Sequence, residues 1–345
     1  SKNKFVLDVY RRVRQCMPMN NRMMRSIKSA AWRCAIDQEK FYLQLFSETA
    51  ARFSPTVFVA HDLPMLPVAS VACKRCGAKL VYDSHELYSE QEFSSREKRR
   101  WVEIESKYIK SCDTVITINP SIARELEQRY KINNVKIIYN AERVEVLPRN
   151  QHLFHRAFGI DPDQKILLFQ GGLSAGRNLE VLIDAMRHVR YPRVELVILG
   201  DGQLQNSIKK KAQRIGLTGR FHLHPAVPQK SLIFFSASAD IGVIPYRASC
   251  LNNYYSTPNK LFEYIAAGLP ILANDLPEIR NIVDTHQIGC VGDMSTAEKA
   301  AWLIDQGFSN ARRLEAWRNQ VEQVRQLINW ENESIKLIEI FEQFR

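Results

Sequence analysis

The sequence predicts an α/β protein built from two doubly wound, Rossmann-like domains. Short β-branched runs alternate along the chain with longer helical patterns, which is typical of parallel βαβ units. With 345 residues and the apolar, charged and glycine fractions of a globular protein, the chain is long enough for two separate cores. An irregular polar segment, residues 141–163, contains Pro148 and Pro162 and is the predicted linker between the two series of units.

The strands are expected where apolar, β-branched runs are short. The first series falls near Thr56–Ala60, Lys79–Asp83, Thr114–Ile118 and Val135–Tyr139. The second falls near Lys165–Gln170, Glu195–Leu199, Arg220–His224, Ile241–Ile244, Pro270–Ala273 and Gly289–Val291. Since open α/β sheets bind ligands at the carboxyl ends of their strands, we expect the active site in a cleft between the two domains.

The segment Tyr255–Pro270 predicts a loop followed by a sharply started helix. Thr257 is the expected N-cap, and Pro258 suits the first helical position, where no amide hydrogen is needed. Gly268 and Pro270 should end the helix about three turns later. A helix with so defined a start can present free N–H groups to an anion.

Two charged side chains on this helix predict contacts to a nucleotide. Free amides are expected at Lys260 and Leu261, and the Lys260 ammonium adds a full positive charge for phosphate. Glu263 lies three residues further on, on the same face, where its carboxylate can accept hydrogen bonds from ribose hydroxyls. The alternative is an ordinary capped helix with a surface ion pair between Lys260 and Glu263.

The Pro258–Tyr264 run, Pro-Asn-Lys-Leu-Phe-Glu-Tyr, resembles the donor-binding motif of retaining glycosyltransferases of the GT-B fold, specifically glycosyltransferase family 4 (glycosyl transferases group 1). Further segments resemble successive landmarks of that family, namely Val57–Asp62, Val81–Glu86, Phe169–Leu173 with Arg177, and Leu199–Gly202. One departure is that the family's first motif glutamate falls on Tyr255. Donor-sugar recognition is therefore not carried over to that position.

The resemblance implies a nucleotide-sugar site in the second domain. Gly171 and Gly172 follow a predicted strand and allow close backbone approach to a diphosphate, and Arg177 can grip phosphate oxygens; the alternative is a common Gly-Gly turn with a surface arginine. Family members usually carry an arginine where Gly172 stands. The expected donor-binding residues are Gly171, Gly172, Arg177, Val227, Thr257, Lys260, Leu261 and Glu263.

The predicted catalytic residues are His61 and Glu263. His61 follows a strand at its carboxyl end, and the resemblance makes it our candidate for orienting the donor sugar by hydrogen bonding; a structural histidine is the alternative. His85 and Glu86 are acceptor-side candidates, and Asp83 could serve either role. Because no Asp-x-Asp motif lies beside the donor helix, we expect no metal and no cofactor besides the nucleotide-sugar substrate, with UDP as its nucleotide.

The resemblance also implies which domain binds which substrate. Residues 1–145 form the expected acceptor-side domain, residues 146–324 bind the nucleotide sugar, and a C-terminal helix, residues 325–345, packs back on the first domain. Family members open with a strand and a glycine-rich loop, whereas no strand is predicted here before Val57. The first domain is therefore either abridged or begins with helices.

Charge and cysteine content bound the location and partners of the protein. Much of the net charge of +11 lies in residues 1–40, where ten Lys or Arg face three acidic residues among apolar side chains. This pattern predicts a surface for anionic lipid, with solvated basic helices as the alternative and nucleic acid as a weaker one. No run of eighteen apolar residues and no leader peptide is visible, so we expect a cytoplasmic protein, with a peripheral position at the inner membrane face as an alternative.

Seven cysteines at irregular spacing favour reduced thiols over a disulfide framework. Cys73 and Cys76 form a lone Cys-x-x-Cys pair, for which two half-buried thiols at a helix end are a simpler interpretation than zinc or redox chemistry.

The predicted function is transfer of a sugar, with retention, from a nucleotide-diphosphate sugar to a lipid-linked or polysaccharide acceptor in bacterial surface glycan synthesis. Two alternatives remain open: a nucleotide-sugar 2-epimerase of the same fold, and a non-catalytic donor-binding or scaffold subunit. A nicotinamide dehydrogenase is disfavoured because no Gly-x-Gly-x-x-Gly follows a strand.

Overall fold

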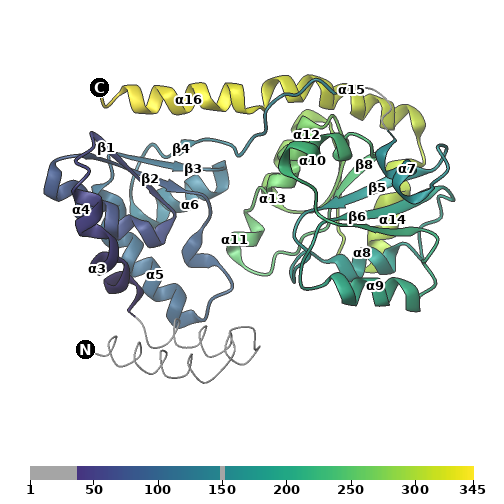
Figure 1. Ribbon diagram of the computed structural model, residues 1–345, viewed down its shortest axis with the longest axis horizontal. Helices are drawn as coiled ribbons and strands as arrows, with labels where there is room; N and C mark the ends of the chain where they lie inside the picture. Colours follow the sequence, from purple (N-terminus) through teal and green to yellow (C-terminus); the bar gives the residue numbers. More distant parts are fainter. Residues whose placement is uncertain (1–36, 148–151) are drawn as a thin grey trace. The chain divides into compact units, whose positions relative to one another are not determined.

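The computed structural model describes residues 37–147 and 152–345, which form two compact units (Figure 1). Unit 1 comprises the described residues up to Thr117, with Ala123–Ile137 and Gln343–Arg345. Unit 2 comprises Ile118–Ile122 and Ile138–Glu342. Each unit contains a parallel sheet with helical crossovers, which confirms the predicted fold class. The basic surface expected in residues 1–40 lies almost wholly outside the described residues.

Unit 1 is built on a four-stranded parallel sheet in the order β1-β2-β3-β4. Its strands are β1 (Val57–His61), β2 (Lys79–Ser84), β3 (Thr114–Thr117) and β4 (Lys136–Ile137). The helices in this part of the chain are α3 (Gln38–Ala51), α4 (Leu66–Cys76), α5 (Ser95–Tyr108) and α6 (Pro120–Tyr130), with short 3₁₀ turns at Leu63–Met65, Tyr88–Glu90 and Ile109–Ser111.

Two strand boundaries in unit 1 matter for the site and the sheet edge. β1 runs one residue further than predicted, so His61 is its last residue and pairs in register with Asp83 of β2. β4 is much shorter than the predicted Val135–Tyr139. The reason is that the backbone N–H of Val135 donates to the Glu127 carboxylate, and that of Tyr139 to the Glu333 carboxylate, instead of to a neighbouring strand.

Unit 2 is built on a six-stranded parallel sheet in the order β10-β9-β8-β5-β6-β7. Its strands are β5 (Lys165–Gln170), β6 (Val194–Leu199), β7 (Phe221–His224), β8 (Ile241–Ile244), β9 (Ile271–Asn274) and β10 (Gly289–Gly292). Read from β7, this is the doubly wound order in which the chain reverses direction across the sheet between β5 and β8. Helices α8 and α9 lie on one face of this sheet, and α10 and α12 on the other (Figure 1).

The helices of unit 2 connect these strands and then close the chain. They are α7 (Leu153–Phe158), α8 (Leu179–Ala185), α9 (Gln205–Arg214), α10 (Gln229–Ser236), α11 (Leu251–Tyr254), α12 (Asn259–Ala266), α13 (Pro277–His286), α14 (Ala297–Phe308), α15 (Ala311–Leu327) and α16 (Trp330–Glu342). Throughout the described part of the chain, the helices fall short of the length and apolar character that crossing a membrane requires.

The core of unit 2 explains why its strands were predictable. Leu167 of β5, Ile198 of β6 and Leu272 of β9 are fully buried, as expected for a parallel sheet covered on both faces. Tyr264 of α12 is also fully buried, and its hydroxyl donates to the Leu168 carbonyl at 3.0 Å. This hydrogen bond joins α12 to the central strand β5.

The predicted linker is partly helical, so this expectation is wrong in part. α7 lies inside residues 141–163 because its apolar residues have partners in unit 2. Phe154 is fully buried, and its ring lies 5.5 Å from that of Phe235 on α10. The prediction of helices in the C-terminal tail is confirmed by α15 and α16.

Candidate active site

The loops at the reversal point of the unit 2 sheet form a cradle of backbone and cations. Gly171 directly follows β5 and has φ +112°, a conformation that favours glycine. Gly200, which follows β6, packs so tightly here that a Cβ atom would lie 2.1 Å from the Gly171 carbonyl oxygen. The predicted Gly171–Gly172 turn is therefore present, and the glycine after β6 is required by the close approach of the two loops.

Lys260 enters this cradle from the start of α12. Its side chain is only 6 % exposed, and its Nζ lies 3.4 Å from where a Cβ on Gly171 would be. The ammonium donates a short hydrogen bond to the Tyr246 hydroxyl and lies 5.0 Å from the centre of the Phe169 ring. The alternative of a surface ion pair with Glu263 is therefore wrong, because Lys260 is buried against aromatic rings.

Arg177 is the second cation of the site and stacks on the same tyrosine. Its guanidinium carbon lies 4.2 Å from the centre of the Tyr246 ring. Its Nε is buried and lacks a hydrogen-bond partner among the residues that the structure describes. A buried donor without an acceptor costs free energy. An anion that accepts from Arg177 would remove that cost.

This environment lowers the pKa of Lys260. Burial, followed by the positive charge of Arg177, lowers the pKa of Lys260 to about 7, while Glu263 opposes the shift. Burial therefore disfavours the charged form of the lysine when no ligand is bound. A bound phosphate would favour the charged form and restore the ammonium.

Glu263 is held by a side chain that the sequence did not reveal. The amide nitrogen of Gln170, the last residue of β5, donates to its carboxylate at 2.6 Å, and the amide oxygen of Gln170 accepts from the Ser236 hydroxyl at 2.6 Å. Gln170 is fully buried, so this chain of bonds fixes the carboxylate. Glu263 also borders a hollow of about 680 Å³ that Gln229 and Trp330 line.

The start of α12 differs from the prediction in three residues. Pro258 is the N-cap, with an extended backbone (ψ 143°), and the helix begins at Asn259. Thr257 does not cap the helix; it is 2 % exposed and accepts from the Asn119 amide at 3.3 Å. The Leu261 N–H donates to the Pro258 carbonyl at 2.8 Å, so it is not free for an anion. The extended conformation at Pro258 moves the helix start by one residue. The predicted stop holds, because Gly268 adopts φ +69° just beyond the helix.

The remaining predicted donor residues lie on neighbouring loops of unit 2. Val227 is half-buried between β7 and α10, next to Ala226, whose N–H donates to the Asp201 carboxylate at 3.2 Å. Asp201 follows β6 and thus links its loop to the one after β7. Gly172 is exposed with open space at its Cβ position.

A second group of predicted residues comes together at the carboxyl ends of β1 and β2 in unit 1. One oxygen of Asp83 lies 3.0 Å from Nδ1 of His61 and 3.0 Å from Nε2 of His85. The two imidazole rings stack with centroids 5.6 Å apart. The hydrogen bond to Asp83 raises the pKa of His85 above its ordinary value. The two histidines thus form one cluster, which we call the histidine cluster, and His85 is the less exposed of the two.

The other predicted residues of unit 1 stand apart from the histidine cluster in their bonding. Glu86 is half-buried and accepts a short hydrogen bond from the Gln91 side chain. Cys73 and Cys76 each direct their sulfur at backbone carbonyls, those of Lys79 and Ala72 respectively. Burial raises the pKa of Cys73 to about 11. The described cysteines are free thiols, as the sequence predicts.

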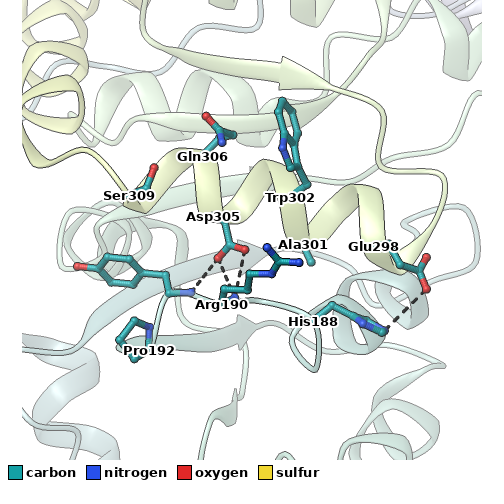
Figure 2. A pocket seen from close by; sticks show the side chains of 10 residues that line it. His188, Arg190, Pro192, Glu298, Ala301, Trp302, Asp305, Gln306 and Ser309 are labelled. Atoms are coloured by element: carbon teal, nitrogen blue, oxygen red, sulfur yellow. Dashed lines mark hydrogen bonds and ion pairs between the residues drawn. The ribbon is translucent and has the colours of Figure 1, made fainter.

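A separate hollow of about 810 Å³ in unit 2 lies between the loop that precedes β6 and helix α14 (Figure 2). The Asp305 carboxylate of α14 accepts from the backbone N–H groups of Arg190 and Tyr191 at 2.9 Å. Trp302 is 61 % exposed on the same helix. Both bonds of Asp305 go to the backbone of the loop before β6, so this carboxylate anchors that loop to α14.

The two parallel α/β units define a protein of GT-B architecture, and the comparisons identify its family. The model of glycosyl transferases group 1 matches residues 150–324, and that of glycosyltransferase family 4 matches residues 30–142. The chain therefore belongs to the group 1 glycosyl transferases and is a glycosyltransferase.

The relatives are distant, and the chain spans only part of several of them. An uncharacterized glycosyltransferase of Methanocaldococcus jannaschii (MJ1607) is 23% identical over 79% of this chain and 67% of its own. The alpha-monoglucosyldiacylglycerol synthase of Streptococcus pneumoniae is 22% identical over 49% of this chain and 39% of its own. The crystal structure of Anabaena HepE in complex with UDP superposes with a TM-score of 0.73, at 17% identity over 86% of this chain and 80% of that one.

Proposed function

We propose that the protein transfers a hexosyl group from a UDP-sugar, with retention of anomeric configuration and without a metal, to a lipid-linked or polysaccharide acceptor. The observation that carries the proposal is the pair formed by Lys260 and Arg177 around Tyr246, with the Arg177 Nε lacking an acceptor among the described residues. Two cations and a glycine turn at the reversal point of a doubly wound sheet suit a diphosphate.

In this proposal the two cations stabilise the leaving diphosphate. Negative charge builds on the phosphate oxygens as the bond to the sugar breaks, and cations fixed in advance stabilise that charge without reorganisation. Lys260 takes up a proton as the donor binds, since its pKa of about 7 leaves it partly neutral beforehand. This arrangement of Lys260 and Arg177 supports transfer without a divalent ion.

The nucleoside would be read by Glu263 and by the loop at Val227. A carboxylate accepts hydrogen bonds from two vicinal ribose hydroxyls, and Gln170 holds Glu263 in place for that role. The UDP complex of the HepE structure supports uracil as the base, because HepE shares this fold.

The sugar side would be served by the histidine cluster. His61, our first candidate, and His85 both face Asp83, which orients the two rings for hydrogen bonding to sugar hydroxyls. For retention, a phosphate oxygen of the leaving group would assist the incoming hydroxyl on the same face of the sugar. The Glu86 carboxylate would serve the acceptor.

The acceptor would be a bacterial surface glycan or its lipid-linked precursor. The name of the S. pneumoniae relative, a glycolipid synthase, supports a lipid acceptor. The basic residues 1–40 would place the enzyme on anionic lipid at the inner membrane face.

The proposal is tested by thermal-shift binding of UDP, GDP, ADP and CMP to the wild type and to Lys260→Ala. A ligand that binds only the folded protein raises its melting temperature by mass action. We expect UDP to give the largest shift and Lys260→Ala to remove most of it. Lys209→Ala, on the exposed face of α9, is the matched control and should retain the shift.

Transfer assays with UDP-glucose and a diacylglycerol acceptor complete the test. Turnover by the isolated protein, with the product in the α configuration as in the α-linked donor, supports a retaining transferase. UDP binding without any turnover, on a panel of lipid and glycan acceptors, would instead support the donor-binding scaffold. If none of the nucleotides binds, the α12 helix is structural and the proposed function is wrong.

A further inference from the structure

Three metal-ligating atoms converge in the histidine cluster of unit 1. Nδ1 of His61 and Nε2 of His85 lie 3.3 Å apart, and each is 3.0 Å from the same oxygen of Asp83. The grouping has two imidazoles and one carboxylate, with each residue offering one ligand atom. It stands out from the other ion pairs of the described chain because three potential ligands share one point.

The distances lie at or just below the edge lengths of a tetrahedral zinc site. With Zn–N and Zn–O bonds of about 2.0–2.2 Å, tetrahedral ligand atoms lie roughly 3.3–3.6 Å apart. The observed separations of 3.0–3.3 Å need only small side-chain rotations to reach these values. Without a metal, the same geometry requires both rings to place a proton on the nitrogen that faces Asp83.

The backbone holds two of the ligands in place before any ion binds. His61 and Asp83 are register partners on the adjacent parallel strands β1 and β2, and His85 follows Asp83 by two residues. The N–H of Asp62 donates to the Asp83 carbonyl at 3.0 Å, which closes the end of the strand pair. The neighbouring residue Asp62 has a buried Oδ1 without a hydrogen-bond partner among the described residues, so one carboxyl oxygen next to the cluster is unsatisfied.

We propose that His61, Asp83 and His85 form a binding site for a zinc-class divalent transition metal with one open coordination position. Two imidazoles with one carboxylate suit Zn²⁺, Co²⁺, Ni²⁺ or Cu²⁺, whereas Mg²⁺ and Ca²⁺ favour all-oxygen ligands. The His61 side chain is 66 % exposed, so an ion can reach the site and keep a water or a substrate hydroxyl as its fourth ligand. The site goes beyond the proposed transfer reaction, which needs no metal.

The competing thiol site is weaker in geometry. The sulfurs of Cys73 and Cys76 bond separate backbone carbonyls along α4. Among the described residues, the histidine cluster is the one group in which three potential metal ligands lie close together. The cysteine pair is therefore the natural control for binding elsewhere.

The test is calorimetric titration of Zn²⁺ into the untagged, full-length protein, with Co²⁺ absorption spectroscopy as a second probe. We expect one Zn²⁺ per chain and a Co²⁺ spectrum with visible d–d bands and no strong thiolate charge-transfer band. His61→Ala, His85→Ala and Asp83→Asn should each weaken Zn²⁺ binding about tenfold or more, since each removes one of three ligands.

Two variants control for other sites. His188→Ala removes a histidine that faces a single carboxylate, Glu298, at 3.8 Å, and Cys76→Ser removes one thiol of the cysteine pair. Both should bind Zn²⁺ as the wild type does. His61 is largely exposed, so its replacement leaves the core intact, and a circular dichroism melt verifies folding of each variant.

Two results would overturn the proposal. One is the absence of a one-to-one Zn²⁺ site in the wild type at Zn²⁺ concentrations up to about 0.1 mM. The other is loss of binding in Cys76→Ser with retention in the three histidine-cluster variants. Because no step measures transfer, failure of the proposed enzyme activity leaves this test unaffected.

Discussion

At the scale of single residues, Lys260 is placed at the expense of stability. A lysine buried against Tyr246 and beside Arg177 has its pKa lowered to about 7, chiefly by burial. The unfolded chain binds a proton at this residue up to a pH near its ordinary pKa of 10.5, whereas the folded chain releases it above about 7. Stability of the ligand-free protein therefore rises with pH through this window, because the unfolded state binds more protons.

We predict that Lys260→Met stabilises the ligand-free protein at neutral pH. Met fills a similar volume without a charge to desolvate, so the variant avoids the cost of burying the ammonium. Each kcal/mol gained raises the melting temperature by about 2–4 °C for a domain of this size. The gain should be largest at pH 7 and shrink as the pH rises toward 10.5, above which the lysine is neutral in both states.

The measurement is a set of thermal melts of both proteins between pH 7 and pH 10 without nucleotide. Lys209→Met, on exposed α9, is the control and should change little at any pH. A lower melting temperature for Lys260→Met at pH 7 would mean that the bond to Tyr246 outweighs the cost of burial.

Gln170 provides a second prediction at the residue scale, which rests on Glu263 reading the ribose. If Gln170 holds the carboxylate, Gln170→Ala should weaken UDP binding by about ten- to a hundredfold, the range for a hydrogen bond to a charged group. The same variant should lose the preference for UDP over 2′-deoxy-UDP. Calorimetric titration of both nucleotides measures this, with Glu263→Ala as the reference. Unchanged discrimination in Gln170→Ala would show that Glu263 needs no support.

The sequence predicted some of these residues and missed others for a physical reason. Lys260, Glu263 and Gly171 lie within local motifs whose spacing carries the chemistry. Gln170, at the end of β5, contacts Glu263, and Tyr246, just after β8, contacts Lys260; both contacts join residues far apart in the sequence and have no signature along the chain. The predicted N-cap at Thr257 and the predicted first helical position at Pro258 were wrong, because residue propensities do not register the extended backbone that makes Pro258 the N-cap.

At the scale of elements, the motif on α12 contains both candidate site residues and residues that pack the helix against the sheet. Lys260 and Glu263 face the site, whereas Tyr264 is buried beneath it and bonds the Leu168 carbonyl of β5. Gly242 of β8 leaves room for the Tyr264 ring, since a Cβ there would lie 2.5 Å from a ring carbon. The helix is thus held against the sheet by Tyr264, the residue that follows Glu263.

We predict that Gly242→Ala destabilises unit 2 by about 1–3 kcal/mol, the usual cost of overpacking a core. The added methyl must displace the Tyr264 ring or the strand, since the ring has no free space around it. Chemical denaturation measures the change. Gly219→Ala is the control, because a Cβ there meets nothing within 4 Å. Equal stability of the two variants would mean that α12 shifts without cost.

Elements were predictable where burial is two-sided and less so where local contacts decide. The strands β5 and β8 were predicted at their observed bounds, because parallel strands covered on both faces read as continuous apolar runs. The predicted β4 was too long, because the backbone N–H groups of Val135 and Tyr139 donate to the carboxylates of Glu127 and Glu333 and not to a neighbouring strand. α7 was missed because its turn-rich surroundings hide the apolar side of a six-residue helix.

At the scale of the whole molecule, the candidate groups divide between the two units. Lys260, Arg177 and Glu263 belong to unit 2, and the histidine cluster belongs to unit 1. Nucleotide binding and the chemistry at the sugar should therefore be separable by mutation. The division follows from two independent sheets, each of which gathers side chains at the carboxyl ends of its own strands.

This division gives a prediction about metals that combines the proposed reaction with the proposed zinc site. Transfer should be unaffected by EDTA, because Lys260 and Arg177 neutralise the diphosphate. Added Zn²⁺ should inhibit transfer, because the ion occupies the ring nitrogens of His61 and His85 that would otherwise bond the sugar. Since those rings lie in unit 1, Zn²⁺ should lower kcat while the UDP-induced thermal shift, a property of unit 2, stays unchanged.

The measurement is the initial rate of transfer against Zn²⁺ concentration, with and without EDTA, beside UDP thermal shifts under the same conditions. Asp83→Asn keeps both imidazoles and should be less sensitive to Zn²⁺ by about the factor by which its Zn²⁺ affinity falls, whereas Cys76→Ser should be inhibited like the wild type. Loss of activity in EDTA would reverse the assignment and make the metal a participant in transfer. Inhibition that persists unchanged in Asp83→Asn would place the inhibitory ion outside the histidine cluster.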